Sequence, residues 1–351
     1  MSWKTSGWLG RWGMAMVVLV CSAFALRSLA LIDATGLWCD ELFTVGKSFQ
    51  PSYNALLAML RLDTHPPFYY SLVWLWGQLL PASGVSLRLF SWIAYLAGGL
   101  LITAQARALV RQTPFARPRL AIIAAALMAF CSPYPVRFAI EGKSYSLLVF
   151  LVALAWWCRR CNQWLGYGLS VTFAGLTHYY GLFLFASTVI WDAWRGRRRA
   201  SLIALAGLVP ALAWIVHASA YLMHSGTGAW IGRPDFALLE DTLARALGLW
   251  PLPKLGLLLL VAVVIARCGL QPSRSEPDVS AGVQVALAEV SGLAPSLLMV
   301  GGLVAISFWK PLAFSRYFVV LLPALIPWLA VRLSALRLTQ RGRGLVALTA
   351  A

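Results

Sequence analysis

Apolar segments of about 15 to 22 residues follow one another along the whole chain, with short polar turns between them. Of the 351 residues, 60% are hydrophobic and 12% are charged, whereas roughly a quarter of the residues of a soluble domain carry a charge. Such a chain has no room for a separate water-soluble domain. We predict one all-α, polytopic transmembrane domain over residues 1–351.

The apolar segments predict about ten spans. Their expected ranges are 13–31, 88–107, 120–136, 144–157, 164–178, 179–194, 201–221, 253–267, 290–308 and 318–331. The segment 67–80 is different, because prolines bound it on both sides and leave roughly 21 Å of helix, too little for a bilayer of about 30 Å. Its Tyr and Trp side chains favour an interfacial helix.

Basic residues outnumber acidic ones by 29 to 12, for a net charge of +17. The arginines gather in short clusters between spans, at 111–119, 159–160, 195–199 and 337–343. This distribution is typical of cytoplasmic turns and places the N-terminus inside. Nucleic acid is not an expected partner, because a protein that follows phosphates carries its basic residues on one contiguous face. The outer segments are then 33–88, 137–145 and 222–252.

The long outer segment 33–88 concentrates the acids of the chain. Asp40 and Glu41 stand side by side, and the run Asp63-Thr64-His65-Pro66-Pro67-Phe68-Tyr69-Tyr70 follows. A carboxylate next to the membrane can serve as general base towards a hydroxyl acceptor. The alternative is a solvated loop carboxylate.

Three further outer turns carry polar residues beside a span. Arg137, Glu141 and Tyr145 recur on one helical face with Lys143 off it, His178 and Tyr179 lie between two spans, and Arg316 and Tyr317 precede the last span. Charged residues at a membrane boundary usually have a functional role or form an ion pair. The alternatives are an Arg137–Glu141 ion pair, a packed histidine, and cations that snorkel to the interface. All three turns lie on the face that carries Asp40.

The order of these motifs resembles the bacterial dolichyl-phosphate-mannose-protein mannosyltransferase-like glycosyltransferases (family 39), membrane enzymes with the C-type glycosyltransferase (GT-C) fold. The motifs are the Asp-Glu pair, His-Pro-Pro-aromatic-Tyr-Tyr, Arg-x-x-x-Glu-x-Lys-x-Tyr, Thr-His-Tyr-Tyr and a late Arg-Tyr. The resemblance covers roughly residues 10–335. The chain ends soon after its last arginine cluster, so either a further span is missing or this is a short member.

The resemblance implies an inverting transfer of a sugar from a polyprenyl-phosphate donor to a lipid, glycan or protein acceptor. The site would lie on the periplasmic or extracellular side of the bacterial inner membrane. Asp40 matches the proposed base and Glu41 the second acid, which orients the acceptor or a metal. The matching donor-phosphate and substrate positions are His65, Tyr69, Arg137, Glu141, Lys143, Tyr145, His178, Tyr179, Arg316 and Tyr317.

A lipid phosphate is a good leaving group that needs positive charge where negative charge develops, and the boundary arginines and lysine supply it. We expect no obligatory metal, although Asp40, Glu41 and His65 could hold Mg²⁺ or Mn²⁺. The outer segment 222–252 is the expected acceptor side.

Other function classes remain as alternatives. A transporter or flippase of a lipid-linked sugar would have charges near the bilayer midplane and two repeated halves, and the sequence shows neither. Another polyprenyl-dependent membrane transferase, or a non-catalytic membrane subunit, is the remaining alternative.

Overall fold

The computed structural model describes residues 7–113, 116–224, 230–247, 270–272 and 281–338. In these described ranges the protein is helical, with one short pair of antiparallel strands, β1 (Leu270–Pro272) and β2 (Leu336–Leu338). The predicted all-α architecture is confirmed. The expected span at 253–267 lies outside the described residues.

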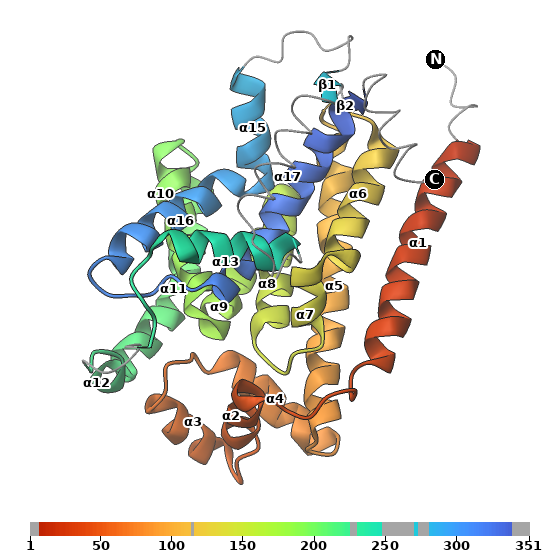
Figure 1. Cartoon of the computed structure of the whole chain (residues 1–351). Coiled ribbons are helices and arrows are strands. Elements are labelled where there is room, and N and C mark those ends of the chain that lie inside the picture. Colours follow the sequence, from red (N-terminus) through yellow and green to blue (C-terminus); the bar gives the residue numbers. More distant parts are fainter. Residues whose placement is uncertain (1–6, 114–115, 225–229, 248–269, 273–280, 339–351) are drawn as a thin grey trace.

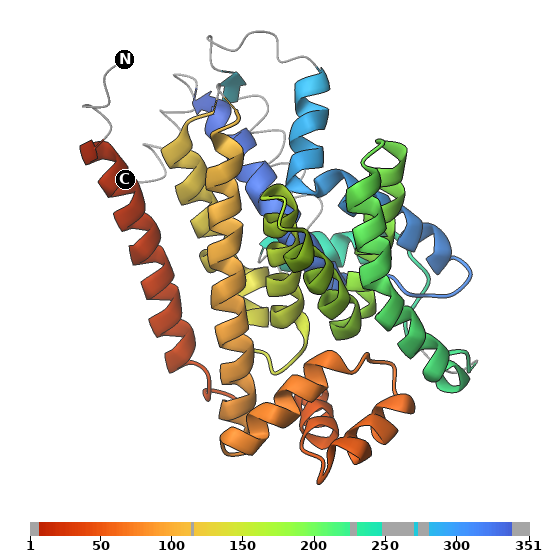
Figure 2. The same cartoon turned by 180° about the vertical axis from the view of Figure 1, so that it is seen from behind.

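Long helices run side by side through the molecule and define its two ends (Figures 1 and 2). They are α1 (Gly7–Ala30), α5 (Gly84–Val110), α6 (Pro118–Cys131), α8 (Tyr145–Arg160), α9 (Trp164–Thr177), α10 (Tyr179–Trp194), α11 (Arg198–His217) and α17 (Leu322–Ala335). Among the described residues, four helical segments are long and apolar enough to cross a membrane: Gly13–Ala30, Gly84–Val110, Arg198–His217 and Ser315–Ala335. The 14 to 16 residues of α8, α9 and α10 correspond to about 21 to 24 Å each, which is shorter than the hydrocarbon core.

The long outer segment forms a layer of three short helices beneath the bundle (Figure 1). These are α2 (Cys39–Ser48), α3 (Tyr53–Arg61) and α4 (Phe68–Leu79). α3 begins where the hydroxyl of Ser52 accepts a hydrogen bond from the Ala55 amide at 3.2 Å, and α5 begins in the same way at Ser83 and Ser86. We call the end of the molecule that carries this layer the α2–α4 end. The helix predicted at 67–80 corresponds to α4.

Two expected spans are broken in the structure. The segment 120–136 divides into α6 and α7 (Pro133–Ala139), because Ser132 precedes a proline and takes an extended conformation with ψ 144°. The segment 290–308 divides into α15 (Ala281–Ser291) and α16 (Leu293–Ser307) at Gly292, whose φ of +87° suits glycine. A side chain there would also strike Trp156, 2.5 Å from the position of a Cβ.

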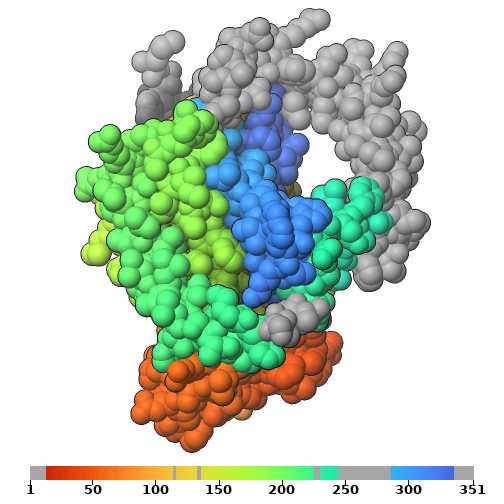
Figure 3. All heavy atoms as spheres, turned by 90° about the vertical axis from the view of Figure 1, so that its left-hand side faces the viewer, coloured from red at the N-terminus to blue at the C-terminus, as the bar shows by residue number. Residues whose placement is uncertain are grey.

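Close helix contacts build the core between α5 and α8. A Cβ on Gly98 of α5 would lie 3.1 Å from the backbone of Phe150 in α8, so the small residue permits this approach. α10, α11 and α16 lie next to one another on one side of the bundle, with the α2–α4 layer below them (Figure 3). The remaining described elements are α12 (Ser219–Leu222), α13 (Phe236–Leu247) and the 3₁₀ helix η2 (Ser315–Leu321). α13 contacts both α7 and η2.

Candidate functional site

Asp40 and Arg316 meet at the boundary between the α2–α4 layer and the bundle. Asp40 is in the first turn of α2, and its Oδ2 accepts a hydrogen bond from the NH1 of Arg316 in η2 at 2.5 Å. The Arg316 guanidinium also lies over the rings of Trp38 and Phe314, 5.2 and 4.9 Å from their centres. The side chain of Asp40 is 33% exposed. It therefore combines an ordered position with access from outside.

Glu41, the next residue, points the opposite way into the protein. Its side chain is 1% exposed and accepts hydrogen bonds from the Nε and NH2 of Arg88 at 2.8 and 2.7 Å. The Gly142 amide donates to the same carboxylate at 2.7 Å. Burial raises the pKa of Glu41, but the Arg88 and Gly142 hydrogen bonds outweigh burial and hold this pKa below its usual value. Glu41 thus joins α2, α5 and the turn between α7 and α8.

That turn holds two buried residues of opposite charge. Neither carboxylate oxygen of Glu141 has a hydrogen-bond partner among the described residues, so Arg137 does not donate a hydrogen bond to it. Burial raises the pKa of Glu141 to about 7, against the pull of the Arg137 and Arg316 charges. Burial lowers the pKa of Lys143 to about 8, and the Asp40 charge opposes this shift. Both residues are therefore close to a change of charge at neutral pH.

Asp63 and His65 form a second ionic group in the α2–α4 layer. The Nδ1 of His65 lies 2.6 Å from the Oδ1 of Asp63, and the Nζ of Lys47 forms an ion pair with the other oxygen. Burial raises the pKa of Asp63, but the hydrogen bonds from His65 and Lys47 lower it well below its usual range. Burial also lowers the pKa of His65, despite the opposing hydrogen bond and charge of Asp63.

Aromatic rings from three elements pack beside this group. The ring centre of His178 is 4.9 Å from that of Tyr317 and 5.9 Å from that of Tyr145. His178 Nδ1 accepts a hydrogen bond from the Tyr180 amide at 3.1 Å. Nδ1 therefore carries no proton, and Nε2 is the donor of this imidazole.

A cavity of about 330 Å³ opens between these aromatic rings and the Asp63–His65 pair. Its lining is mainly apolar and aromatic and includes His65, His178, Tyr179, Tyr317, Trp230 and Lys310. Trp230 belongs to the expected acceptor segment 222–252, and its ring packs against that of Phe314 at 5.0 Å. Residues 225–229 and 248–252 of that segment lie outside the described residues.

The structure brings most of the expected site residues to this one region. Tyr69 is 0% exposed and packs against Tyr70 and Phe90, within electrostatic range of Glu41 and Glu141. Arg137 is exposed on α7, within electrostatic range of Glu141. In the described part of the chain, no three His, Cys, Asp or Glu side chains lie close enough together to hold a metal ion.

Sequence reasoning missed Lys47 and Arg88. Arg88 lies at the start of the apolar helix α5 and is 5% exposed. Besides Glu41, it donates to the carbonyls of Ile32, Thr35 and Gly36. A charge inside an apolar helix needs a partner, so the position of Arg88 in the sequence already indicated a buried ion pair. Lys47 gave no such signal, because its partner Asp63 is distant in sequence.

The fold is similar to that of two solved structures. No family model matches the sequence, and no curated protein matches it. Two crystal structures of ArnT from Cupriavidus metallidurans do match. The apo structure has a TM-score of 0.56 at 18% identity over 93% of this chain. The structure bound to undecaprenyl phosphate has a TM-score of 0.57 at 18% identity over 98% of this chain.

The chain spans 61% and 63% of the length of these two ArnT chains. The likeness shows that the protein has the GT-C fold, as the motif order had indicated. At 18% identity, the likeness to ArnT establishes the fold alone, and the function of this protein must be argued from its site.

Proposed function

We propose that the protein is an inverting glycosyltransferase that moves a sugar from a polyprenyl-phosphate donor to a lipid, glycan or protein acceptor. The observation that carries the proposal is the ion pair between Asp40 and Arg316, which joins the proposed base to a proposed phosphate ligand across 276 residues of sequence. The crystal structure of ArnT with undecaprenyl phosphate supports a donor of this class for the shared fold. Membership of family 39 remains part of the proposal.

The charges of the site suit a phosphate leaving group. Lys143 and Arg316 both lie within electrostatic range of Asp40 and Glu141. Negative charge develops on the donor phosphate as the glycosidic bond breaks, and fixed cations stabilise it most effectively in a site with little water. The lipid phosphate can then leave without receiving a proton from a general acid.

Asp40 is the proposed general base. It takes the proton of the acceptor hydroxyl as the oxygen attacks the anomeric carbon from the side opposite the phosphate, which inverts the configuration. Arg316 positions the carboxylate through the 2.5 Å hydrogen bond. Glu41 acts as a positioning residue, because its oxygens already accept hydrogen bonds from Arg88 and Gly142.

The apolar cavity beside His65 and His178 fits the proximal isoprenoid units of the donor. Its lining is mainly apolar, as in most pockets for hydrophobic ligands, and Lys310 at its margin donates to the Leu222 carbonyl at 3.1 Å. The segment with Trp230 adjoins this cavity and is the proposed acceptor side.

The proposed orientation follows from the charges of the two ends. The turns at the end opposite α2–α4 hold the arginine clusters at 111–119, 159–160 and 195–199. The positive-inside rule places this end in the cytoplasm. The candidate site then faces the periplasm or the exterior of a bacterial inner membrane.

The direct test is transfer by the purified protein from radiolabelled polyprenyl-phosphate sugars to a membrane extract. We expect labelled product with at least one such donor and none with nucleotide sugars. We also propose that no metal is obligatory, so chelator should leave turnover unchanged. Absence of product with every polyprenyl donor would contradict the transferase, and a complete loss with chelator that Mn²⁺ or Mg²⁺ restores would contradict the metal-free site.

The charge of Lys143 predicts a pH dependence of donor binding. Its pKa is lowered to about 8 by burial, so the cation is present below pH 8 and is lost as the pH rises through that value. We expect KM for the donor to rise about tenfold from pH 7 to pH 9.5, as a charged hydrogen bond to phosphate is lost. The measurement is KM for the donor across this range.

Lys143→Arg is the matched control, because arginine keeps its charge throughout the range. Its KM should be independent of pH, whatever its absolute value. A rise above pH 8 that persists in Lys143→Arg would assign the effect to another group.

A further inference from the structure

A second cavity, of about 630 Å³, lies at the opposite end of the molecule from the candidate site. Its lining includes five arginines and one carboxylate. The arginines are Arg159, Arg160, Arg197, Arg198 and Arg199. They come from the turns on either side of α9 and α10, and the carboxylate is Glu289 of α15. No step of the proposed transfer uses this cavity.

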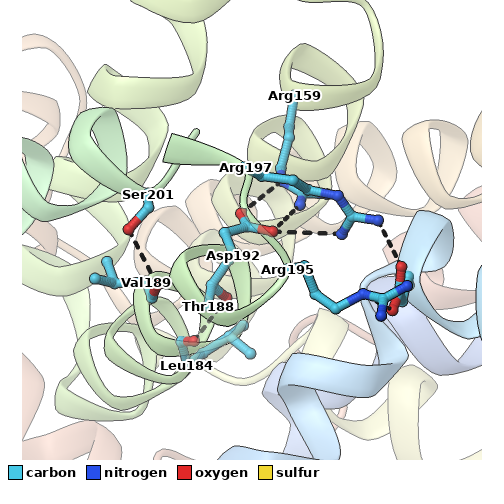
Figure 4. A network of polar contacts seen from close by, with 9 residues as sticks. Arg159, Leu184, Thr188, Val189, Asp192, Arg195, Arg197 and Ser201 are labelled. Carbon is cyan, nitrogen blue, oxygen red and sulfur yellow. Dashed lines mark hydrogen bonds and ion pairs between the residues drawn. The ribbon is translucent and has the colours of Figure 1, made fainter. Parts of the chain in front are cut away.

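Two buried carboxylates neutralise part of this charge (Figure 4). Asp192, whose side chain is 0% exposed, accepts from Arg159 and lies 3.5 Å from the NH1 of Arg197. Glu289, 2% exposed, pairs with the NH2 of Arg197 at 2.5 Å and the Nε of Arg195 at 2.7 Å. This network connects the turn before α11 to α15 and fixes the walls of the cavity.

The other three cations have no carboxylate partner among the residues that the structure describes. Arg160 donates to the carbonyls of Gln105 and Val290, and its buried Nε has no hydrogen-bond partner there. Arg199 lies over the Trp164 ring at 4.9 Å, which leaves the edge of its guanidinium available. Arg198 is exposed. An excess of fixed positive charge around a cavity attracts an anion.

The start of α11 adds to this attraction. The helix begins at Arg198 without a side-chain cap and without an acid in its first turn. The positive end of the dipole of this 20-residue helix lies at Arg198–Ala200, and these residues line the cavity. Planar guanidinium groups beside free backbone amides are the usual ligands of a phosphate group.

Exposed apolar side chains lie at the same end of the molecule as the cavity, near the ends of α9, α10 and α11. Leu165 is 78% exposed next to Trp164, Trp194 is 72% exposed next to Arg195, and Leu202 is 65% exposed two residues beyond Ala200. A soluble phosphate ester has no use for this apolar surface. An amphiphile could place its phosphate among the arginines and its acyl chains along Leu165, Trp194 and Leu202.

We propose that this arginine-lined cavity binds the phosphate headgroup of an anionic phospholipid. In the orientation proposed above, the lipid belongs to the cytoplasmic leaflet, where basic pockets between helices recognise such headgroups. The single negative charge of the bound phosphate offsets part of the positive charge of Arg160, Arg198 and Arg199, and the phosphate bridges the turn before α9 and the first turn of α11.

The test is lipid retention by the purified full chain in detergent, followed by native mass spectrometry. Phosphatidylglycerol should remain bound, whereas phosphatidylcholine with the same acyl chains, which has no net charge, should not. Each Arg→Gln change near the membrane surface costs about fivefold in affinity. Arg198→Gln with Arg199→Gln should therefore weaken phosphatidylglycerol binding about 30-fold.

Arg107→Gln with Arg332→Gln is the control, since both arginines lie at the same end outside the cavity lining. Its affinity should stay within about twofold of the unmodified protein. Equal weakening in both double variants, or equal retention of the two lipids, would overturn the proposal. Displacement of the lipid by an equal concentration of glycerol 3-phosphate would identify a soluble phosphate ester as the ligand instead.

Binding is measured without sugar transfer, so failure of the lipid proposal and failure of the transferase proposal are distinguishable. If the double variant does not yield a monodisperse protein, Arg199→Gln alone takes its place, with an expected loss of about fivefold. Unchanged binding in Arg199→Gln would then overturn the proposal.

Discussion

Asp40→Asn is expected to lower sugar transfer by about 10²- to 10⁴-fold, the usual contribution of a general base. The amide has the shape of the carboxylate and still accepts a hydrogen bond from Arg316, but it cannot take a proton from the acceptor. The loss should therefore fall on kcat with little change in donor KM. The measurement is initial rates at equal amounts of folded protein.

Asp33→Asn is the matched control, because Asp33 is an exposed acid of the same outer segment. It should keep full activity. Substantial transfer by Asp40→Asn would move the base elsewhere, and Glu141 would become the first candidate. Glu141 is buried without a partner among the described residues, and its pKa of about 7 suits proton transfer near neutral pH.

Arg88→Met is expected to destabilise the protein by about 3 to 5 kcal/mol. The change leaves the buried carboxylate of Glu41 without its two strongest hydrogen bonds and frees three backbone carbonyls. Thermal or denaturant unfolding in detergent measures the loss. Arg61→Met, at an exposed arginine of α3, should change stability by less than about 0.5 kcal/mol.

A double-mutant cycle shows whether the ion pair causes the loss. Adding Glu41→Gln to Arg88→Met should restore part of the stability, because no unpaired charge is then buried. The pKa of Glu41 is lowered from 4.5, so the pair stabilises the protein above that pH, and its contribution is lost as the pH falls towards the lower folded value. Purely additive effects would contradict this assignment.

Hydropathy and proline positions were sufficient to predict the helical architecture. The boundaries of α4, α8, α9 and α10 agree with the expected ranges to within a few residues. The breaks at Ser132 and Gly292 were not foreseen, because an apolar run looks the same whether its helix is straight or divided. Pro133 and Pro135 were the available signal for the first break.

The sequence predicted which residues belong to the candidate site, but it did not predict which residues they contact. Charge placement grouped Asp40, Lys143, His178 and Arg316 on one face, and the structure brings them to one region. Tyr69 shares a motif with His65, yet it is buried in the core. A motif specifies neighbours along the chain, whereas the direction of a helix side chain depends on which face of the helix is packed.

The adjacent acids Asp40 and Glu41 show most clearly the difference between what the sequence predicts and what the packing of the helices decides. The sequence alone determined that two adjacent carboxylates lie in a long segment between apolar spans, and that the arginine clusters lie in other turns. The tertiary structure decided which carboxylate is exposed with Arg316 and which is buried with Arg88. Consecutive helix residues point about 100° apart, so the two acids cannot share one environment. The packing of α2 against α5 and the Gly142 turn turns Glu41 inward and leaves Asp40 at the site.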